Sequence, residues 1–242
     1  MESIYRKSAR KATVFAELLR AGLWEGEARL SQFDKVDYDE IMRFAEEQSV
    51  VGLVTVGLEH VNDKKIPQEW LLQFIGETLQ IEQQNKDMNA FVARLIDKLR
   101  KKDVYAILVK GQGVAQCYEK PLWRCSGDID LFLSDTNYQK AKAILIPLTS
   151  KVEGEYEREK HLGMTIDGWV VELHGRLYSG LSSRIERELD LVQKDTFYGG
   201  AVRSWNCDGV QVFLMKAEND VLCVHSYLAT LLQRRIGDAA GV

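Results

Sequence analysis

Residues Arg124 to Leu133 read Arg-Cys-Ser-Gly-Asp-Ile-Asp-Leu-Phe-Leu, a pair of aspartates that opens an apolar run. Side chains alternate between the two faces of a β-strand, so Asp128 and Asp130 are predicted to project from one face. Two carboxylates about 4 Å apart repel each other by roughly 4 kcal/mol at an effective dielectric constant near 20. A shared proton, a basic side chain or a divalent cation such as Mg²⁺ must offset that repulsion. The alternative interpretation is a turn whose acidic residues cap and solubilise a strand end.

The segment before the aspartates, Ala106 to Ala115, indicates a strand followed by a short helix. An apolar run ends in Lys110-Gly111, and Gly113 follows before residues that favour a helix. Glycines at such a junction let the backbone approach a ligand closely, and the start of a helix offers unpaired N–H groups to an anion. Glycine turns of this kind are common by themselves. Because this segment lies one short helix before the aspartate pair, the two together predict a phosphate site that faces a metal site.

The segment after the aspartates predicts a β-hairpin. Asp167-Gly168 separates two alternating apolar runs between Leu162 and His174, and this dipeptide is typical of a two-residue type I′ turn. On the second strand Glu172 and His174 share a face. Glu172 is either solvated on an edge strand or directed at a site. Together with the aspartates it would supply a third carboxylate, and three carboxylates suffice to hold two metal ions.

This spaced combination resembles an uncharacterised bacterial nucleotidyltransferase-like family within the superfamily that includes DNA polymerase β. The resemblance is close from about Tyr105 to His174 and extends to the flanks only in their helical character. The matching positions are Lys110-Gly111, Tyr118, Pro121, Arg124, Gly127-Asp128-Ile129-Asp130 and Glu172-Leu173-His174. One position departs from the pattern, because Gln112 stands where many members of the superfamily have serine or glycine.

The resemblance implies an enzyme that moves a nucleoside monophosphate from an NTP to an acceptor hydroxyl, with release of pyrophosphate and with Mg²⁺ or Mn²⁺ as cofactor. It makes Asp128, Asp130 and Glu172 the catalytic residues and the metal ligands. The residues implied to bind the nucleotide are Lys110, Gly111, Gly113, Arg124 and Gly127. Arg124 is either a phosphate clamp or a structural partner of the acidic loop, and His174 is interpreted as a residue that orients Glu172 or packs. The acceptor stays open among a protein, an RNA, an antibiotic and a small metabolite.

Two other classes of function compete with this interpretation. A catalytically degenerate relative that binds a nucleotide or a partner protein could keep the acidic residues and show an altered phosphate loop. A metal-dependent glycosyltransferase also uses two aspartates at this spacing, but it usually has about a hundred residues of alternating strands and helices before them, and here only helices are expected. We therefore rank the glycosyltransferase last.

Composition limits the partners and the cellular location to be expected for this protein. A net charge of −4 and a pI near 5.7 argue against a broad nucleic-acid-binding surface. The N-terminus has no apolar signal-peptide core and no apolar run is long enough to span a membrane, so a cytoplasmic protein without a membrane partner is expected. The cysteines lack metal-binding spacing and are predicted to be reduced, buried thiols. They are Cys117, Cys125, Cys207 and Cys223.

The expected fold class is α+β, with a helical domain at residues 1–101, a nucleotidyltransferase-like core with a small mixed sheet at 102–216, and a C-terminal helix at 217–242. The resembling family usually continues with more helices, so a truncated chain, a frameshifted gene and a minimal member stay open. Expected helices cover Ala16–Leu23, Asp39–His60, Pro67–Leu99 (one helix or two), Thr136–Leu148 with Asp135 as N-cap, Ser182–Gln193 and Asn219–Arg235. Strands are expected at Gly199–Arg203 and Val210–Met215, and His225 is expected to pack in a core.

Overall fold

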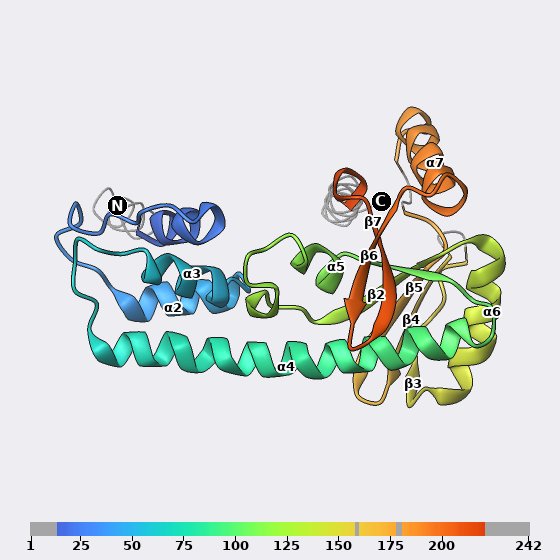
Figure 1. Cartoon of the computed structure of the whole chain (residues 1–242), viewed down its shortest axis with the longest axis horizontal. Helices are drawn as coiled ribbons and strands as arrows, with labels where there is room; N and C mark the ends of the chain where they lie inside the picture. Colours follow the sequence, from blue (N-terminus) through green and yellow to red (C-terminus); the bar gives the residue numbers. More distant parts are fainter. Residues whose placement is uncertain (1–13, 158–159, 178–180, 221–242) are drawn as a thin grey trace, which may run out of the picture. The chain divides into compact units, whose positions relative to one another are not determined.

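The structure is a computed structural model that describes residues 14–157, 160–177 and 181–220. It has the α+β class that the sequence predicts, with helices in its first part and a seven-stranded mixed sheet in its second (Figure 1). Chain contacts define two compact units. Unit 1 comprises Met1–Asp87 and Tyr118–Cys125, and unit 2 comprises Met88–Cys117 and Ser126–Val242. The sequence-based ranges differ from these units, which divide inside a helix and assign Tyr118–Cys125 to the helical unit.

Helices build unit 1, and among the described residues before Tyr105 the only β pairing is an isolated bridge between Ala28 and Val61. The helices are residues 14–24, α2 (Tyr38–Glu47), α3 (Val51–Glu59) and the 33-residue α4 (Gln68–Arg100), whose last part belongs to unit 2. The single helix expected over Asp39–His60 is wrong. The chain breaks between α2 and α3, where Ser49 has a left-handed φ of 56° that a continuing α-helix cannot accommodate. The segment from Pro67 onward forms one helix.

Close helix contacts hold unit 1 together. A Cβ atom on Gly57 of α3 would lie 2.0 Å from the carbonyl oxygen of Leu18, and one on Gly22 would lie 1.9 Å from that of Leu53. The two helices therefore meet backbone to backbone through a pair of glycines. A Cβ on Gly52 would lie 2.0 Å from the carbonyl oxygen of Trp123, so the segment Tyr118–Cys125 packs on α3 with equal closeness.

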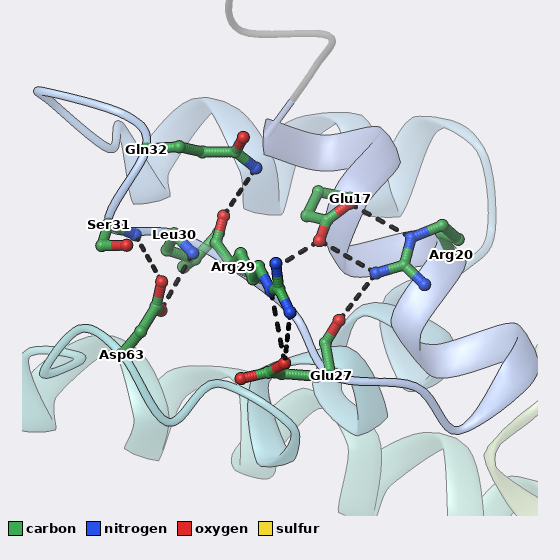
Figure 2. A network of polar contacts seen from close by, with 8 residues as sticks. All are labelled: Glu17, Arg20, Glu27, Arg29, Leu30, Ser31, Gln32 and Asp63. Carbon is green, nitrogen blue, oxygen red and sulfur yellow. Dashed lines mark hydrogen bonds and ion pairs between the residues drawn. The ribbon is translucent and has the colours of Figure 1, made fainter.

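A polar network orders the loop that follows the first helix (Figure 2). Arg20 donates to the carboxylate of Glu17 at 2.9 Å and to the carbonyl oxygen of Glu27 at 2.7 Å. Asp63 accepts the backbone N–H groups of Leu30 and Ser31 at 3.0 and 2.9 Å. These bonds satisfy backbone groups of a loop that has little regular structure of its own.

The mixed sheet of unit 2 has the strand order β3-β4-β5-β2-β1-β7-β6. Its strands are β1 (Ala106–Val109), β2 (Asp128–Leu133), β3 (Lys151–Val152), β4 (His161–Ile166), β5 (Trp169–His174), β6 (Val202–Cys207) and β7 (Val210–Met215). The β2–β5 and β1–β7 pairs are parallel and the others are antiparallel. The helices of this unit are α6 (Asp135–Leu145), α7 (Ser183–Tyr198) and the short α5 (Gly111–Ala115) and η2 (Ile146–Leu148), and residues 217–220 are helical at the end of the described part. The short helix η1 (Pro121–Trp123) belongs to unit 1.

The two faces of the sheet differ in what covers them. On one face, side chains such as Leu131 and Leu173 pack with the last part of α4 and with Tyr138 of α6 in the main core. On the other face a smaller cluster joins Phe132 to Phe197 of α7, with ring centroids 4.7 Å apart. The candidate site lies on this second, less completely covered face.

The sequence predicted most elements of unit 2 and misplaced some of their ends. The hairpin turn is confirmed, since Asp167 and Gly168 have φ values of 50° and 85°, as a type I′ turn requires. Asp135 is the first residue of α6 rather than its N-cap, which is Ser134. The strand expected at Gly199–Arg203 lies later, because α7 continues to Tyr198 and β6 begins at Val202.

The described cysteines are free thiols, but their predicted burial is only partly right. Cys207 is buried, which raises the pKa of its thiol to about 12, whereas Cys125 is half-buried and Cys117 is exposed. Cys223, His225 and most of the helix expected at Asn219–Arg235 lie outside the described residues. None of the described helices combines the length and the apolar character that crossing a bilayer requires.

The glycine contact in unit 1 gives a stability prediction with a matched control. Gly57→Ala should lower the free energy of unfolding by on the order of 2 kcal/mol, because the new methyl group meets backbone that cannot move aside. Gly76→Ala in α4 should raise it by about 0.5–1 kcal/mol, because no described atom lies within 4 Å of that Cβ position and alanine favours the helix. Urea denaturation measures both values, and equal effects of the two substitutions would contradict the packing argument.

Candidate active site

The parallel pairing of β2 with β5 brings the predicted carboxylates together. Asp130 lies directly beside Glu172 in the register, and Asp128 lies beside Val170. Paired residues of neighbouring strands project from the same face of a sheet, so the three carboxylates converge. One oxygen from each of Asp128, Asp130 and Glu172 lies within 4.8 Å of the other two. The structure therefore places these three residues as the sequence predicts, on one face and within reach of shared cations.

Lys110 also reaches this cluster. Its Nζ lies 2.6 Å from Oδ1 of Asp130, and the Asp130 side chain is only 1% exposed. Lys110 follows β1 with a φ of 53°, a conformation that a lysine seldom adopts and that costs free energy. In this arrangement the ammonium group neutralises a buried carboxylate. The phosphate contact predicted for Lys110 stays a prediction.

Two histidines complete the cluster. Nε2 of His174 lies 2.7 Å from Oδ1 of Asp130 and 3.3 Å from Oε2 of Glu172. Nε2 of His161 lies 3.2 Å from the same Glu172 oxygen, and the two imidazole rings stack with centroids 4.8 Å apart. The sequence reasoning missed His161. Counting back from the Asp167-Gly168 turn could have found it, because His161 pairs with His174 across the hairpin.

The surroundings of these groups shift their pKa values in different directions. Burial, reinforced by the charges of Asp130 and Glu172, raises the pKa of Asp128. Hydrogen bonds from His161 and His174 hold the pKa of Glu172 far below its usual range. Burial alone would lower the pKa of His174, but its hydrogen bonds to Asp130 and Glu172 outweigh that effect and raise it. Glu172 is therefore a persistent anion, and Asp128 is the carboxylate with the least compensation.

The predicted glycines have different surroundings. A Cβ on Gly111 would lie 3.3 Å from the carbonyl oxygen of Asp128, and one on Gly113 would lie 3.1 Å from that of Leu108. Both glycines thus permit tight backbone packing around α5. Gly127, by contrast, has no described atom within 4 Å of its Cβ position. Their predicted contacts with a nucleotide stay predictions.

Arg124 is assigned to unit 1, whereas the residues described above are assigned to unit 2. Its guanidinium group donates to the carbonyl oxygen of Cys125 at 3.2 Å, and its own carbonyl oxygen accepts a bond from Asn85 at 2.8 Å. The Asn85 side chain also donates to the carbonyl oxygen of Leu122 at 2.7 Å, so it ties this segment to α4. These contacts give Arg124 a structural setting, and its role as a phosphate clamp stays a prediction.

The acidic cluster suits a hard divalent cation. Oδ2 of Asp130 is buried and has no hydrogen-bond partner in the described part of the chain. A buried carboxylate oxygen without a partner is costly unless another group, such as a cation, approaches it. Oxygen ligands from several carboxylates are those that Mg²⁺ and Mn²⁺ prefer. The donor set of Asp128, Asp130 and Glu172 therefore fits the cofactor that the sequence predicts.

Comparisons with known proteins identify the family of this chain. The sequence profile of a family described as uncharacterised nucleotidyltransferases matches residues 34–237. The chain therefore belongs to this family, which confirms the resemblance seen in its motifs. Among solved structures, the chain is similar to a proposed nucleotidyltransferase from Thermotoga maritima, with 18% sequence identity and a TM-score of 0.44 over 64% of this chain and 89% of that one. A search of curated proteins found no match.

The negative charge of Asp130 is compensated better than that of Asp128, so replacing each aspartate by asparagine should have opposite effects on stability. Asp128→Asn should raise the melting temperature by about 2–4 °C in metal-free buffer, because it removes a buried charge that its neighbours repel. Asp130→Asn should lower the melting temperature by about 5 °C or more, because Lys110 and His174 would lose the anion that they contact. Thermal melts followed by circular dichroism measure both, and stabilisation by Asp130→Asn would contradict this account of the cluster.

Proposed function

We propose that this protein is a metal-dependent nucleotidyltransferase that moves a nucleoside monophosphate from an NTP to an acceptor hydroxyl group. The convergence of three carboxylates on one strand pair, in a chain of the nucleotidyltransferase family, carries the proposal. In the reaction, the acceptor oxygen forms a bond to the α-phosphorus and the bond from that phosphorus to pyrophosphate breaks. The hydroxyl proton passes to a nearby carboxylate, and pyrophosphate leaves with the electron pair.

Asp128, Asp130 and Glu172 would hold Mg²⁺ or Mn²⁺, which would lower the pKa of the attacking hydroxyl and stabilise the charge on the entering and leaving oxygens. The strand pairing fixes the distance between these carboxylates before any substrate arrives. Such preorganisation avoids the free-energy cost of collecting like charges during the reaction. The low pKa of Glu172 keeps it anionic at the pH where an NTP carries its full charge.

Lys110, Gly111 and Gly113 are proposed to contact the β- and γ-phosphates, and Gly127 and Arg124 are proposed as further nucleotide-binding residues. Lys110 supports this role by its charge and by its position at the acidic cluster. An arriving cation would compete with the ammonium group for Asp130, and the ammonium group would then be available to phosphate oxygens. A cytoplasmic location and an acceptor that is a protein, an RNA or a small molecule complete the proposal.

A catalytically degenerate binding module is the second candidate, and the phosphate loop favours it. The side chain of Gln112 is buried, with its Nε2 3.2 Å from Sδ of Met88. It is therefore directed into the core, whereas the serine found here in many relatives of the superfamily would offer a small hydroxyl group. A protein of this kind would bind a nucleotide without transferring it.

Transfer can be tested directly with each of the four NTPs labelled at the α-phosphate, in Mg²⁺ or Mn²⁺. We expect metal-dependent labelling of the protein itself or of an added acceptor, together with release of pyrophosphate. Glu172→Gln should lower the rate by at least about 10²–10³-fold, the scale on which one preorganised hydrogen-bond donor contributes to catalysis. Removal of the metal by a chelator should abolish transfer.

The control variant is Asp167→Asn, which changes a carboxylate in the hairpin turn where asparagine tolerates the φ of 50°. Its transfer rate should equal that of the unmodified protein. Binding of NTP without any release of pyrophosphate under all of these conditions would favour the degenerate module and would exclude the enzyme.

A further inference from the structure

A second set of metal-ligand atoms lies next to the acidic cluster. Nε2 of His161, Nε2 of His174 and a carboxylate oxygen of Glu172 all lie within 4.8 Å of one another. His161 and His174 are directly opposite each other on β4 and β5, so the hairpin register holds both rings. Both rings direct Nε2 at the same Glu172 oxygen, and this geometry is independent of Asp128.

The two N–O separations within this set resemble those between ligands of one metal ion. Ligand atoms about 2.1 Å from a tetrahedral metal ion lie about 3.4 Å from one another. The two N–O distances here are 3.2 and 3.3 Å. A hydrogen bond between an imidazolium and a carboxylate is usually shorter, about 2.7–2.9 Å. The contact between His174 and Asp130, at 2.7 Å, has that shorter length.

We propose that His161, His174 and Glu172 form a binding site for a first-row transition-metal ion of the Zn²⁺ type, beside the proposed Mg²⁺ site. Two imidazoles and one carboxylate are a ligand set that suits Zn²⁺ or Co²⁺, whereas Mg²⁺ prefers oxygen ligands and water. Three protein ligands leave a fourth position for water or substrate, as in catalytic zinc sites. The inference deepens the proposed function, since Glu172 would then contribute to both metal sites.

The surroundings of the set are compatible with a bound cation. Lys110 lies close to the set, with its Nζ 3.5 Å from Nε2 of His174. When His174 turns to a metal ion while the proposed Mg²⁺ site is empty, Asp130 keeps its ion pair with Lys110 at 2.6 Å. On the outer side, Tyr156 stacks on His161 with ring centroids 5.9 Å apart, and Tyr156 is 55% exposed. The set is therefore supported from within by a buried ion pair and is bordered on the outside by an exposed aromatic ring.

Co²⁺ is a suitable probe because its visible absorption reports nitrogen ligands and a four-coordinate geometry. Protein without an affinity tag is titrated with Co²⁺ alone, and the bound ion is then displaced with Zn²⁺ or with an excess of Mg²⁺. We expect one equivalent of Co²⁺ to bind with intense tetrahedral-type bands. Zn²⁺ should displace it at equal concentration, and millimolar Mg²⁺ should not.

His161→Ala is the decisive variant, because the His161 side chain is 28% exposed and its loss should leave the fold intact. Its Co²⁺ affinity should fall at least about 100-fold, beyond the range known for loss of an outer-shell partner. His60→Ala, in unit 1, is the matched control and should bind Co²⁺ like the unmodified protein. Circular dichroism of each variant verifies folding, and Glu172→Gln provides a second variant that should lose the site.

Equal Co²⁺ binding by the His161→Ala variant and the unmodified protein would overturn the proposal, and so would displacement of Co²⁺ by Mg²⁺ at equal concentration. The result is distinguishable from a failure of the proposed function. Transfer in Mg²⁺ without any Co²⁺ binding would remove only the second site. Co²⁺ binding that depends on His161, without transfer of any NTP, would remove only the enzyme.

Discussion

The register between β2 and β5 is the constraint on which the candidate site depends. It sets Asp130 beside Glu172, and because side chains alternate, a slip of one residue would turn Glu172 to the opposite face. The buried side chains of Ile129, Leu131 and Leu173 oppose such a slip, since it would move apolar groups out of the main core. The core on one face of the sheet thus determines the chemistry on the other. This explains why three carboxylates can be held together although they repel one another.

Charge compensation within the site is uneven, and the unevenness has a structural cause. Asp130 lies in the middle of the sheet and contacts both Lys110 and His174. Glu172, on the neighbouring strand, is in contact with the imidazoles of His161 and His174. Asp128 stands at the start of β2 and forms no ion pair with the described residues. Its burial and the charges of Asp130 and Glu172 outweigh the attraction of Lys110 and raise its pKa. A cation bound at the three carboxylates would therefore be attracted most strongly by Asp128, because the protein compensates the negative charge of Asp128 least.

Local patterns explain what the sequence could predict. Alternation along β2 and β5 and the Asp167-Gly168 turn depend only on neighbouring residues, so the shared face of Asp128 and Asp130 and the hairpin with Glu172 could be derived. Pairing between distant segments was beyond such reasoning. The ion pair of Lys110 requires β1 beside β2. His161, by contrast, was overlooked, although the hairpin turn fixes its pairing with His174. The break at Ser49 was missed because apolar residues such as Phe44 and Val51 recur on both sides of it, and this spacing does not mark the change in backbone conformation.

At Lys110 the backbone conformation and the electrostatics of the site favour different residues. Its φ of 53° is one at which glycine would be the favoured residue, and a non-glycine residue in a sparsely populated region costs on the order of 1–3 kcal/mol. Glycine would relieve this strain but would remove one of the two groups, Lys110 and His174, that contact the buried carboxylate of Asp130, which is the larger cost in a nearly inaccessible position. Electrostatics therefore favours lysine over glycine here. The same residue thus both compensates the buried carboxylate of Asp130 and occupies the strained junction between β1 and α5.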